Sequence, residues 1–184
     1  FSNVSLVLVI NADQGLHSID FRATEFLVQQ LIQVAGRAGR ADAQGRVLIQ
    51  TWLPGHPAVQ AVVKHDYRRF VDLELAQRRQ AGFPPYVHFA LWRVRAAGIS
   101  EPLEFLERVA QHGQSLRPEQ AACFDPVKSP MFKRNGQYHA QLLCSAQQRS
   151  QLHQWLGEWI RRVENDRQLA RSRWSIDVDP LSLF

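Results

Sequence analysis

Two arginines separated by two residues, Arg37 and Arg40, stand in the segment QVAGRAGRA. Their guanidinium groups are planar and permanently charged, and three-residue spacing directs both from one helix face toward one anion. Gly36 and Gly39 remove side chains that would obstruct close approach. Gln33, one turn earlier, can donate a neutral hydrogen bond or orient a water. The pattern favours a sensor of a nucleotide's terminal phosphate. The alternative is a helix end frayed by glycines with two solvated arginines.

A strand–helix–strand pattern surrounds this segment. Residues 4–10 form a continuous apolar run, typical of a strand buried on both faces of a parallel sheet. A helix is expected to begin at Thr24 as its N-cap, and a second buried strand covers 47–51. This order predicts an α/β unit with a parallel sheet. Two further helices are expected, over 57–62 and over 66–82.

The segment GFPPY forbids a helix and marks a domain boundary. Beyond it the elements are expected in the order β-α-β-β-α-β, at residues 89–96, 101–116, 121–127, 138–146, 147–165 and 173–179. That is the split βαβ, ferredoxin-like order of an α+β domain. The predicted division is therefore 1–82 and 83–184. Trp155 and Trp159 belong to an apolar helix stripe and are expected in the core.

Composition and charge limit the classes of protein to which the chain can belong. The chain has 184 residues and a formal net charge of +5, which permits an anionic partner such as nucleic acid. No apolar run is long enough to cross a bilayer. Since the chain starts at Phe1 and no basic stretch precedes the first apolar run, we expect no signal peptide and interpret the chain as a fragment of a longer protein. Cys123 and Cys144 have no CxxC partner, so reduced thiols are favoured over zinc.

The segment QxxGRxGR resembles motif VI of superfamily 2 helicases. Together with FSNVSLVLVINAD, DFRATE, GRVLIQT, RRQAGFPPY and the terminal DVDPLSLF, the chain resembles the carboxyl-terminal quarter of the PriA family of primosomal replication-restart helicases, also called primosomal protein N′. PPY and DVDPxSLF are the more specific of these motifs. The resemblance implies that residues 1–82 are the end of a RecA-like helicase lobe.

The resemblance also implies roles for the opening motif. Arg37 and Arg40 would contact the γ-phosphate of ATP, with Arg40 as the arginine finger, close to Gly36 and Gly39. Gln33 would couple that site to bound DNA or position the attacking water. The cofactor would be ATP with Mg²⁺, bound jointly with an upstream lobe that this chain lacks. The fragment alone is therefore expected to be inactive. Zinc belongs to an upstream insertion of the family, and this chain offers no ligands for it.

Asp13, Asp20 and Arg22 follow the first strand. In helicase lobes of this kind they are interpreted as part of a loop that faces the cleft between lobes. The alternative is turn chemistry, since Asp is also a good turn residue.

A basic and aromatic segment precedes and enters the third expected strand of the second domain, at residues 138–146. Its candidate DNA- or partner-binding residues are Lys128, Lys133, Arg134, Tyr138 and Gln141. Such a mixture suits phosphate contact and base stacking, while the alternative is an ordinary exposed hairpin tip. In the resembled family this hairpin borders a site for the acidic tail of single-stranded DNA-binding protein. The tyrosine is there flanked by arginines, whereas Gln137 and His139 stand here, so we expect weak tail binding.

No metal site is predicted. Asp177 and Asp179 offer too few ligands, and a structural role or a contact between lobe and domain is favoured. The function implied by the resemblance is part of an ATP-dependent 3′-to-5′ DNA helicase that remodels stalled forks and initiates primosome assembly in the bacterial cytoplasm, associated with the nucleoid. Expected partners are forked or single-stranded DNA, single-stranded DNA-binding protein and other primosome proteins, with no membrane. The alternatives are another superfamily 2 translocase, or a non-enzymatic binding module without a motor.

Overall fold

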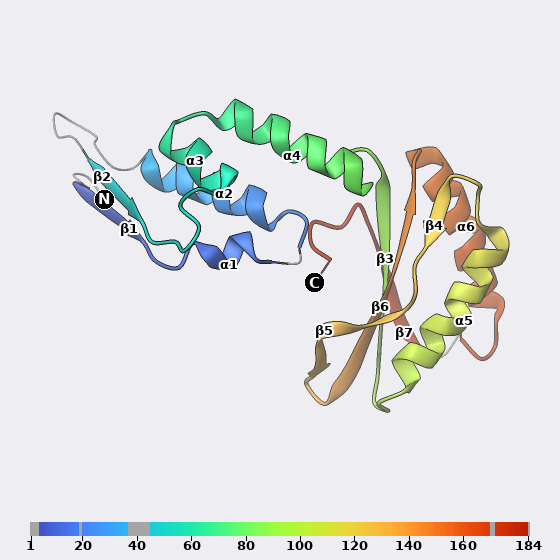
Figure 1. Cartoon of the computed structure of the whole chain (residues 1–184). Coiled ribbons are helices and arrows are strands. Elements are labelled where there is room, and N and C mark those ends of the chain that lie inside the picture. The colour runs from blue at the N-terminus through green and yellow to red at the C-terminus, as the bar shows by residue number, and fades with distance from the viewer. Residues whose placement is uncertain (1–3, 19, 37–44, 170–171, 184) are drawn as a thin grey trace. The chain divides into compact units, whose positions relative to one another are not determined.

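The computed structural model describes residues 4–18, 20–36, 45–169 and 172–183. The chain divides into two compact units, residues 1–80 and residues 81–184 (Figure 1), which are described separately. Within the described residues, no helix is long and apolar enough to span a membrane.

The first unit holds a parallel strand pair, as expected. Its elements are β1 (Leu6–Val9), α1 (Asp13–Leu16), α2 (Ala23–Ala35), β2 (Arg46–Ile49), α3 (Pro57–Val63) and α4 (Tyr67–Ala81). β1 and β2 pair in parallel, so the predicted strand–helix–strand unit is confirmed. α4 ends where Gly82 adopts a φ of +66°, a conformation that glycine reaches without steric cost.

Two details of this unit differ from the prediction. The strands are not buried on both faces, because Leu6, Leu8 and Leu48 are about half exposed at 48%, 59% and 56%. Alternate residues of a strand point to opposite faces, and only the face with Val9 and Ile49 packs on the core that α2 helps to form. In addition, the N-cap of α2 is Arg22 rather than Thr24.

The second unit is a sheet with two helices. Its elements are β3 (His88–Ala96), α5 (Glu101–Leu116), β4 (Ala121–Cys123), β5 (Val127–Arg134), β6 (Gln137–Ala146), α6 (Arg149–Asn165) and β7 (Arg173–Val178). The strands run in the order β4-β6-β3-β7, each antiparallel to its neighbours, and β5 also pairs with β6. The predicted β-α-β-β-α-β order is therefore present with β5 added.

The expectation of one strand over residues 121–127 is wrong. β4 stops at Cys123, and a separate strand, β5, starts at Val127 and pairs with the other end of β6. Pro126 lies between them and has no N–H to donate, so the ladder is interrupted there.

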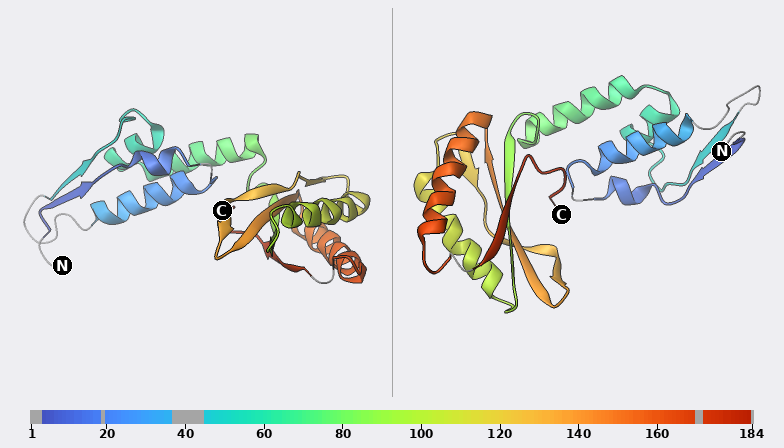
Figure 2. Two further views of the ribbon diagram at one scale, coloured as in Figure 1. Left: turned by 90° about the horizontal axis from the view of Figure 1, so that it is seen from below. Right: turned by 180° about the vertical axis from the view of Figure 1, so that it is seen from behind.

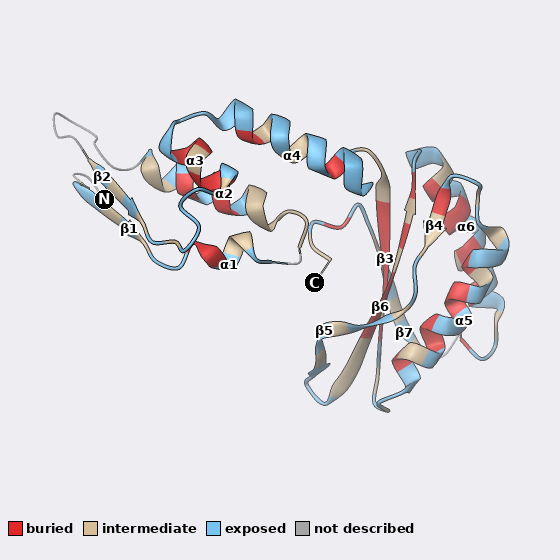
Figure 3. Cartoon of the chain, in the orientation of Figure 1, coloured by how far each residue is buried: buried red, intermediate tan, exposed pale blue. Residues whose placement is uncertain are grey.

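Both helices cover one face of this sheet, as the views in Figure 2 show. Their inward sides are buried together with the even-numbered residues of β3 and β6 (Figure 3). Trp155 and Trp159 are core residues, as predicted. The indole N–H of Trp155 donates to the Gly113 carbonyl at 3.0 Å, and that of Trp159 to the Val109 carbonyl at 2.7 Å. These hydrogen bonds link α6 to α5. They also satisfy the two indole N–H groups, which would otherwise be buried without an acceptor.

The opposite face of the sheet carries the chain's last residues. Arg93 on β3 forms an ion pair with Asp177 at 2.8 Å and donates to the Ser182 carbonyl at 3.2 Å. Its cross-strand neighbour Gln141 donates to the Leu183 carbonyl at 2.9 Å. Asp177 therefore has a structural contact, as the sequence favoured.

Candidate functional site

The centre of the QVAGRAGRA segment lies outside the described residues. Arg37, Gly39 and Arg40 belong to it, so their predicted phosphate contacts stay predictions. The structure describes the residues that precede them, up to Gly36. Gln33 is exposed on the last turn of α2, and Gly36 caps that helix with its N–H on the Ile32 carbonyl at 2.9 Å. The motif thus follows directly on a helix end, in the frame that the sequence predicted.

Asp13 lies in the short helix α1 rather than in a loop, and its place at a cleft between lobes stays a prediction. Its side chain is buried, and its carboxylate accepts hydrogen bonds from the Thr51 hydroxyl at 2.6 Å and from the Trp52 N–H at 3.0 Å. The Thr51 hydrogen bond, together with the Trp52 N–H, holds the pKa of Asp13 below its usual value, against the opposing effect of burial. The carboxylate joins the segments that follow β1 and β2, so its role here is structural.

Asp20 and Arg22 lie in the turn before α2. One carboxylate oxygen of Asp20 accepts from the Arg22 N–H at 2.9 Å, which is the turn chemistry considered as the alternative. The Arg22 guanidinium carbon lies 5.4 Å from the centre of the Phe21 ring. Contact of either side chain with a nucleotide stays a prediction.

Arg78 on α4 is a buried charge that the sequence argument did not single out. Its guanidinium pairs with Glu25 at 2.8 Å and with Glu74 at 3.0 Å, and it donates to the Phe21 carbonyl at 3.2 Å. The four-residue spacing of Glu74 and Arg78 was the available signal. The group ties α4 to α2.

The predicted partner-binding residues do not form one site. Lys128 and Lys133 lie over the rings of Phe132 and Tyr138, 4.7 and 5.3 Å from the ring centres, and the two rings are 5.1 Å apart. Gln141 is three residues from Tyr138 on β6, so the two side chains leave opposite faces of the strand.

Gln141 is also buried rather than free to bind a partner, with its amide engaged by Leu183. Arg134 pairs across the hairpin with Gln137, in phase with Gln141 rather than with Tyr138. The sequence set therefore separates into an aromatic–lysine cluster, made of Lys128, Phe132, Lys133 and Tyr138, and residues of the opposite face.

That opposite face carries a basic recess of about 280 Å³ that the sequence argument missed. Its charged lining comes from alternate positions of three adjacent strands: Arg93, Arg95, His139 and Arg173. The period-two spacing of arginines in the segment WRVRA indicates that Arg93 and Arg95 share a face, but it does not reveal their neighbours on the other strands.

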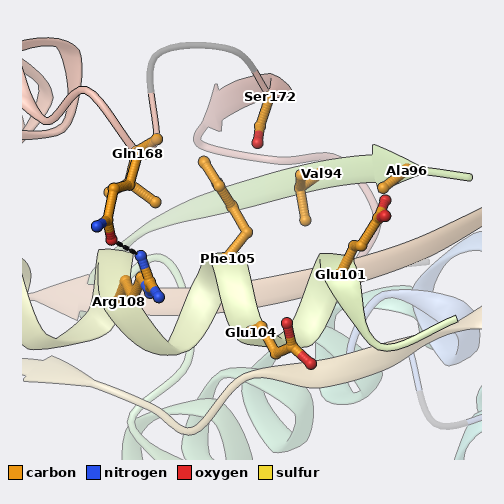
Figure 4. A pocket seen from close by; sticks show the side chains of 9 residues that line it. Val94, Ala96, Glu101, Glu104, Phe105, Arg108, Gln168 and Ser172 are labelled. Carbon is orange, nitrogen blue, oxygen red and sulfur yellow. Dashed lines mark hydrogen bonds between the residues drawn. The ribbon is translucent and has the colours of Figure 1, made fainter. Parts of the chain in front are cut away.

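A second recess, of about 260 Å³, lies between α5, β3 and the segment before β7 (Figure 4). Glu101 and Glu104 stand at one end of it, and Arg108 is hydrogen-bonded to Gln168 at the other. One Glu101 oxygen already accepts from the Gly98 N–H at 3.1 Å. Across the described residues, no group of three or more His, Cys, Asp or Glu side chains could hold a metal ion.

The two cysteines are distant in sequence but are direct partners across β4 and β6. Both are free thiols. Burial raises the pKa of Cys123 to about 11 and raises that of Cys144 still further. Because the thiolate is the reactive form, the raised pKa values lower the reactivity of both thiols at neutral pH.

Comparison with known proteins decides the family. The sequence profile of the "Primosomal protein N C-terminal domain" matches residues 79–181, which include every strand of the second sheet. The chain belongs to the PriA family. "Replication restart protein PriA" of Haemophilus influenzae is 38% identical over 184 residues, and those of Bacillus subtilis and Synechocystis are each 33% identical over 184 residues.

These PriA matches cover 100%, 100% and 99% of the chain but only 25%, 23% and 21% of the relatives. The chain thus corresponds to the C-terminal quarter of PriA, as the sequence motifs indicated. Among solved structures, the de novo designed protein Foldit4 matches 51% of the chain with a TM-score of 0.39 and 10% identity, a likeness too low to carry an argument.

Proposed function

We propose that the chain is the C-terminal part of an ATP-dependent 3′-to-5′ DNA helicase that acts in replication restart, remodelling stalled forks and initiating primosome assembly. The observation that carries this proposal is PriA-family membership over the whole chain. The parallel β1/β2 pair, linked through α2, supports the assignment of the first unit as the end of a RecA-like lobe. The β-α-β-β-α-β order supports a ferredoxin-like C-terminal domain.

In this proposal ATP and Mg²⁺ bind between the first unit and an upstream lobe. Arg37 and Arg40 stabilise the charge that develops on the transferred phosphoryl group, and Gln33 links the site to DNA or to the attacking water. α2 brings the chain to Gly36 immediately before this pair, and the absence of side chains at Gly36 and Gly39 leaves the nucleotide room to approach.

The test uses the full-length protein with Arg40→Ala. We expect DNA-stimulated ATP hydrolysis to fall by about three orders of magnitude or more, because an arginine finger acts on transition-state charge. Nucleotide binding, measured with a fluorescent ATP analogue, should change little. Arg46→Ala is the matched control, since that exposed arginine starts β2 a few residues away. Wild-type turnover by Arg40→Ala would refute the assignment, and equal loss in Arg46→Ala would point to misfolding.

The second unit would bind the partners. We propose that its aromatic–lysine cluster contacts forked or single-stranded DNA in the bacterial cytoplasm, with rings for bases and lysines for phosphates. Docking of the acidic tail of single-stranded DNA-binding protein is proposed to be weak. Gln141, its expected donor, is buried and already bonded to Leu183, and arginines are absent beside Tyr138.

A further inference from the structure

The open face of the second sheet, opposite α5 and α6, bears a row of basic side chains across three strands. Arg95 on β3 stands directly opposite His139 on β6 and directly opposite Arg173 on β7. Arg93 lies two residues before Arg95, on the same face. Neighbouring strands are about 4.8 Å apart, so the row spans about 10 Å. These residues line the recess of about 280 Å³.

Nothing among the described residues neutralises this row. Arg95 and Arg173 are exposed, and neither they nor His139 form a hydrogen bond or ion pair with another described residue. Within β3, β6 and β7, the carboxylate on this face is Asp177, and it is already paired with Arg93. Like charges placed directly opposite one another are unfavourable in a sheet. Their arrangement is therefore better explained by a ligand than by stability.

The chemistry of the recess favours phosphate over an acidic peptide. Val94 and Trp174 also line it, but they occupy alternate positions and pack into the helix-covered core. The face therefore offers guanidinium groups, an imidazole and the Ser175 hydroxyl, without the apolar pocket that an acidic peptide's hydrophobic residues would need. Each strand of a DNA duplex carries about one charge per 3.4 Å of helix axis, and successive phosphates of an extended single strand lie farther apart, so a 10 Å row can meet about two of them.

We infer that the row Arg95, Arg173 and His139 binds the sugar-phosphate backbone of single-stranded DNA. Arg134 stands in phase on the neighbouring hairpin and continues the basic strip. This inference rests on the DNA-binding role proposed above and places a contact on the sheet face opposite the aromatic–lysine cluster.

The test is fluorescence anisotropy of a labelled oligothymidylate with the 184-residue chain over a range of NaCl concentrations. The variant is Arg95→Thr with Arg173→Thr, since threonine keeps strand propensity. We expect affinity to fall about tenfold and the slope of log K against log salt to flatten by about 1.4, about 0.7 for each lost phosphate contact. Arg95→Lys with Arg173→Lys should keep the slope, because the charge is retained.

The matched control is Arg161→Ala with Arg162→Ala, which removes two charges from exposed positions on α6, on the far side of the sheet. It should leave the slope unchanged. The melting temperature of the threonine variant should not fall, because two opposed like charges are relieved. A lower melting temperature with unaltered DNA binding would show a structural role and overturn the inference.

Two further outcomes separate this inference from the proposed function. If Lys128→Ala with Lys133→Ala removes DNA binding while the threonine variant binds as wild type, the DNA role stands and this site is refuted. If the wild-type chain binds no oligothymidylate at any salt concentration, both fail. Equal competition by oligoglutamate would also overturn the inference, because the face would then bind any polyanion.

Discussion

At the scale of single residues, the Asp13 carboxylate is the clearest example of a charge fixed by its neighbours. The Thr51 hydroxyl and the Trp52 N–H both donate to it, and the hydroxyl bond is the larger cause of its lowered pKa. A carboxylate with a depressed folded pKa contributes stability above its unfolded pKa, near 3.8, and loses it as the pH falls through the folded pKa. We expect Thr51→Val to raise the Asp13 pKa toward 3.8.

Carbon-13 NMR titration of the Asp13 carboxyl would measure this change. Asp166, whose pKa is lowered mainly by its hydrogen bond with His112 in the second unit, is the internal control and should not change. An Asp13 pKa that does not move on loss of the Thr51 hydroxyl would contradict the structural role.

The same residues show where sequence reasoning reaches its limit. An aspartate that follows a strand, such as Asp13, is typical of a turn or of a cleft. Its hydrogen-bond partner Thr51 lies 38 positions away in the sequence. Gln141 was expected to bind a partner, but its acceptor is 42 positions away in the last segment. The roles of these polar side chains depend on contacts with residues far away in the sequence, which no local pattern reveals. The apolar stripe that contains Trp155 and Trp159 depends on local spacing, and it was predicted correctly.

At the scale of elements, the packing of α5 against α6 depends on Gly113. A Cβ at this position would overlap the Trp159 ring, whose indole is fixed by its bond to Val109. We expect Gly113→Ala to lower the free energy of unfolding by about 1–2 kcal/mol, because overpacking outweighs the gain of about 1 kcal/mol in helix propensity. Urea unfolding followed by tryptophan fluorescence would measure it.

Gly157 on α6 is the control for this substitution. An added Cβ there meets nothing within 4 Å, so Gly157→Ala should stabilise by up to about 1 kcal/mol through propensity alone. If both alanine variants were stabilised equally, the close approach of the two helices would be disproved.

Helices and strands with a clear apolar pattern in the sequence could be predicted. A strand that is defined mainly by its hydrogen-bonded pairing with another strand could not. The parallel β1/β2 pair, α4 and α6 follow the sequence pattern. β5 was missed because its burial does not alternate cleanly and its pairing with β6 is interrupted by a bulge between Lys128 and Lys133. Without the register of β6 against β3, the row of Arg95, His139 and Arg173 could not be seen either.

At the scale of the whole molecule, the two units differ in how completely they bury their apolar side chains. The core of the second unit runs from Ala90 to Leu169, closed by four paired strands and two helices. The first unit has a two-stranded sheet with leucines exposed on one face, and such a pair of strands is only marginally stable in water.

We therefore expect residues 81–184 to fold alone, with a cooperative thermal transition by circular dichroism and dispersed amide NMR signals, and residues 1–80 to show neither. The comparison is internal, because each fragment serves as the control for the other. A fragment 81–184 that binds a hydrophobic dye and melts without a transition would contradict this division, and a cooperatively folded 1–80 would show that α2, α3 and α4 suffice to stabilise the β1/β2 pair.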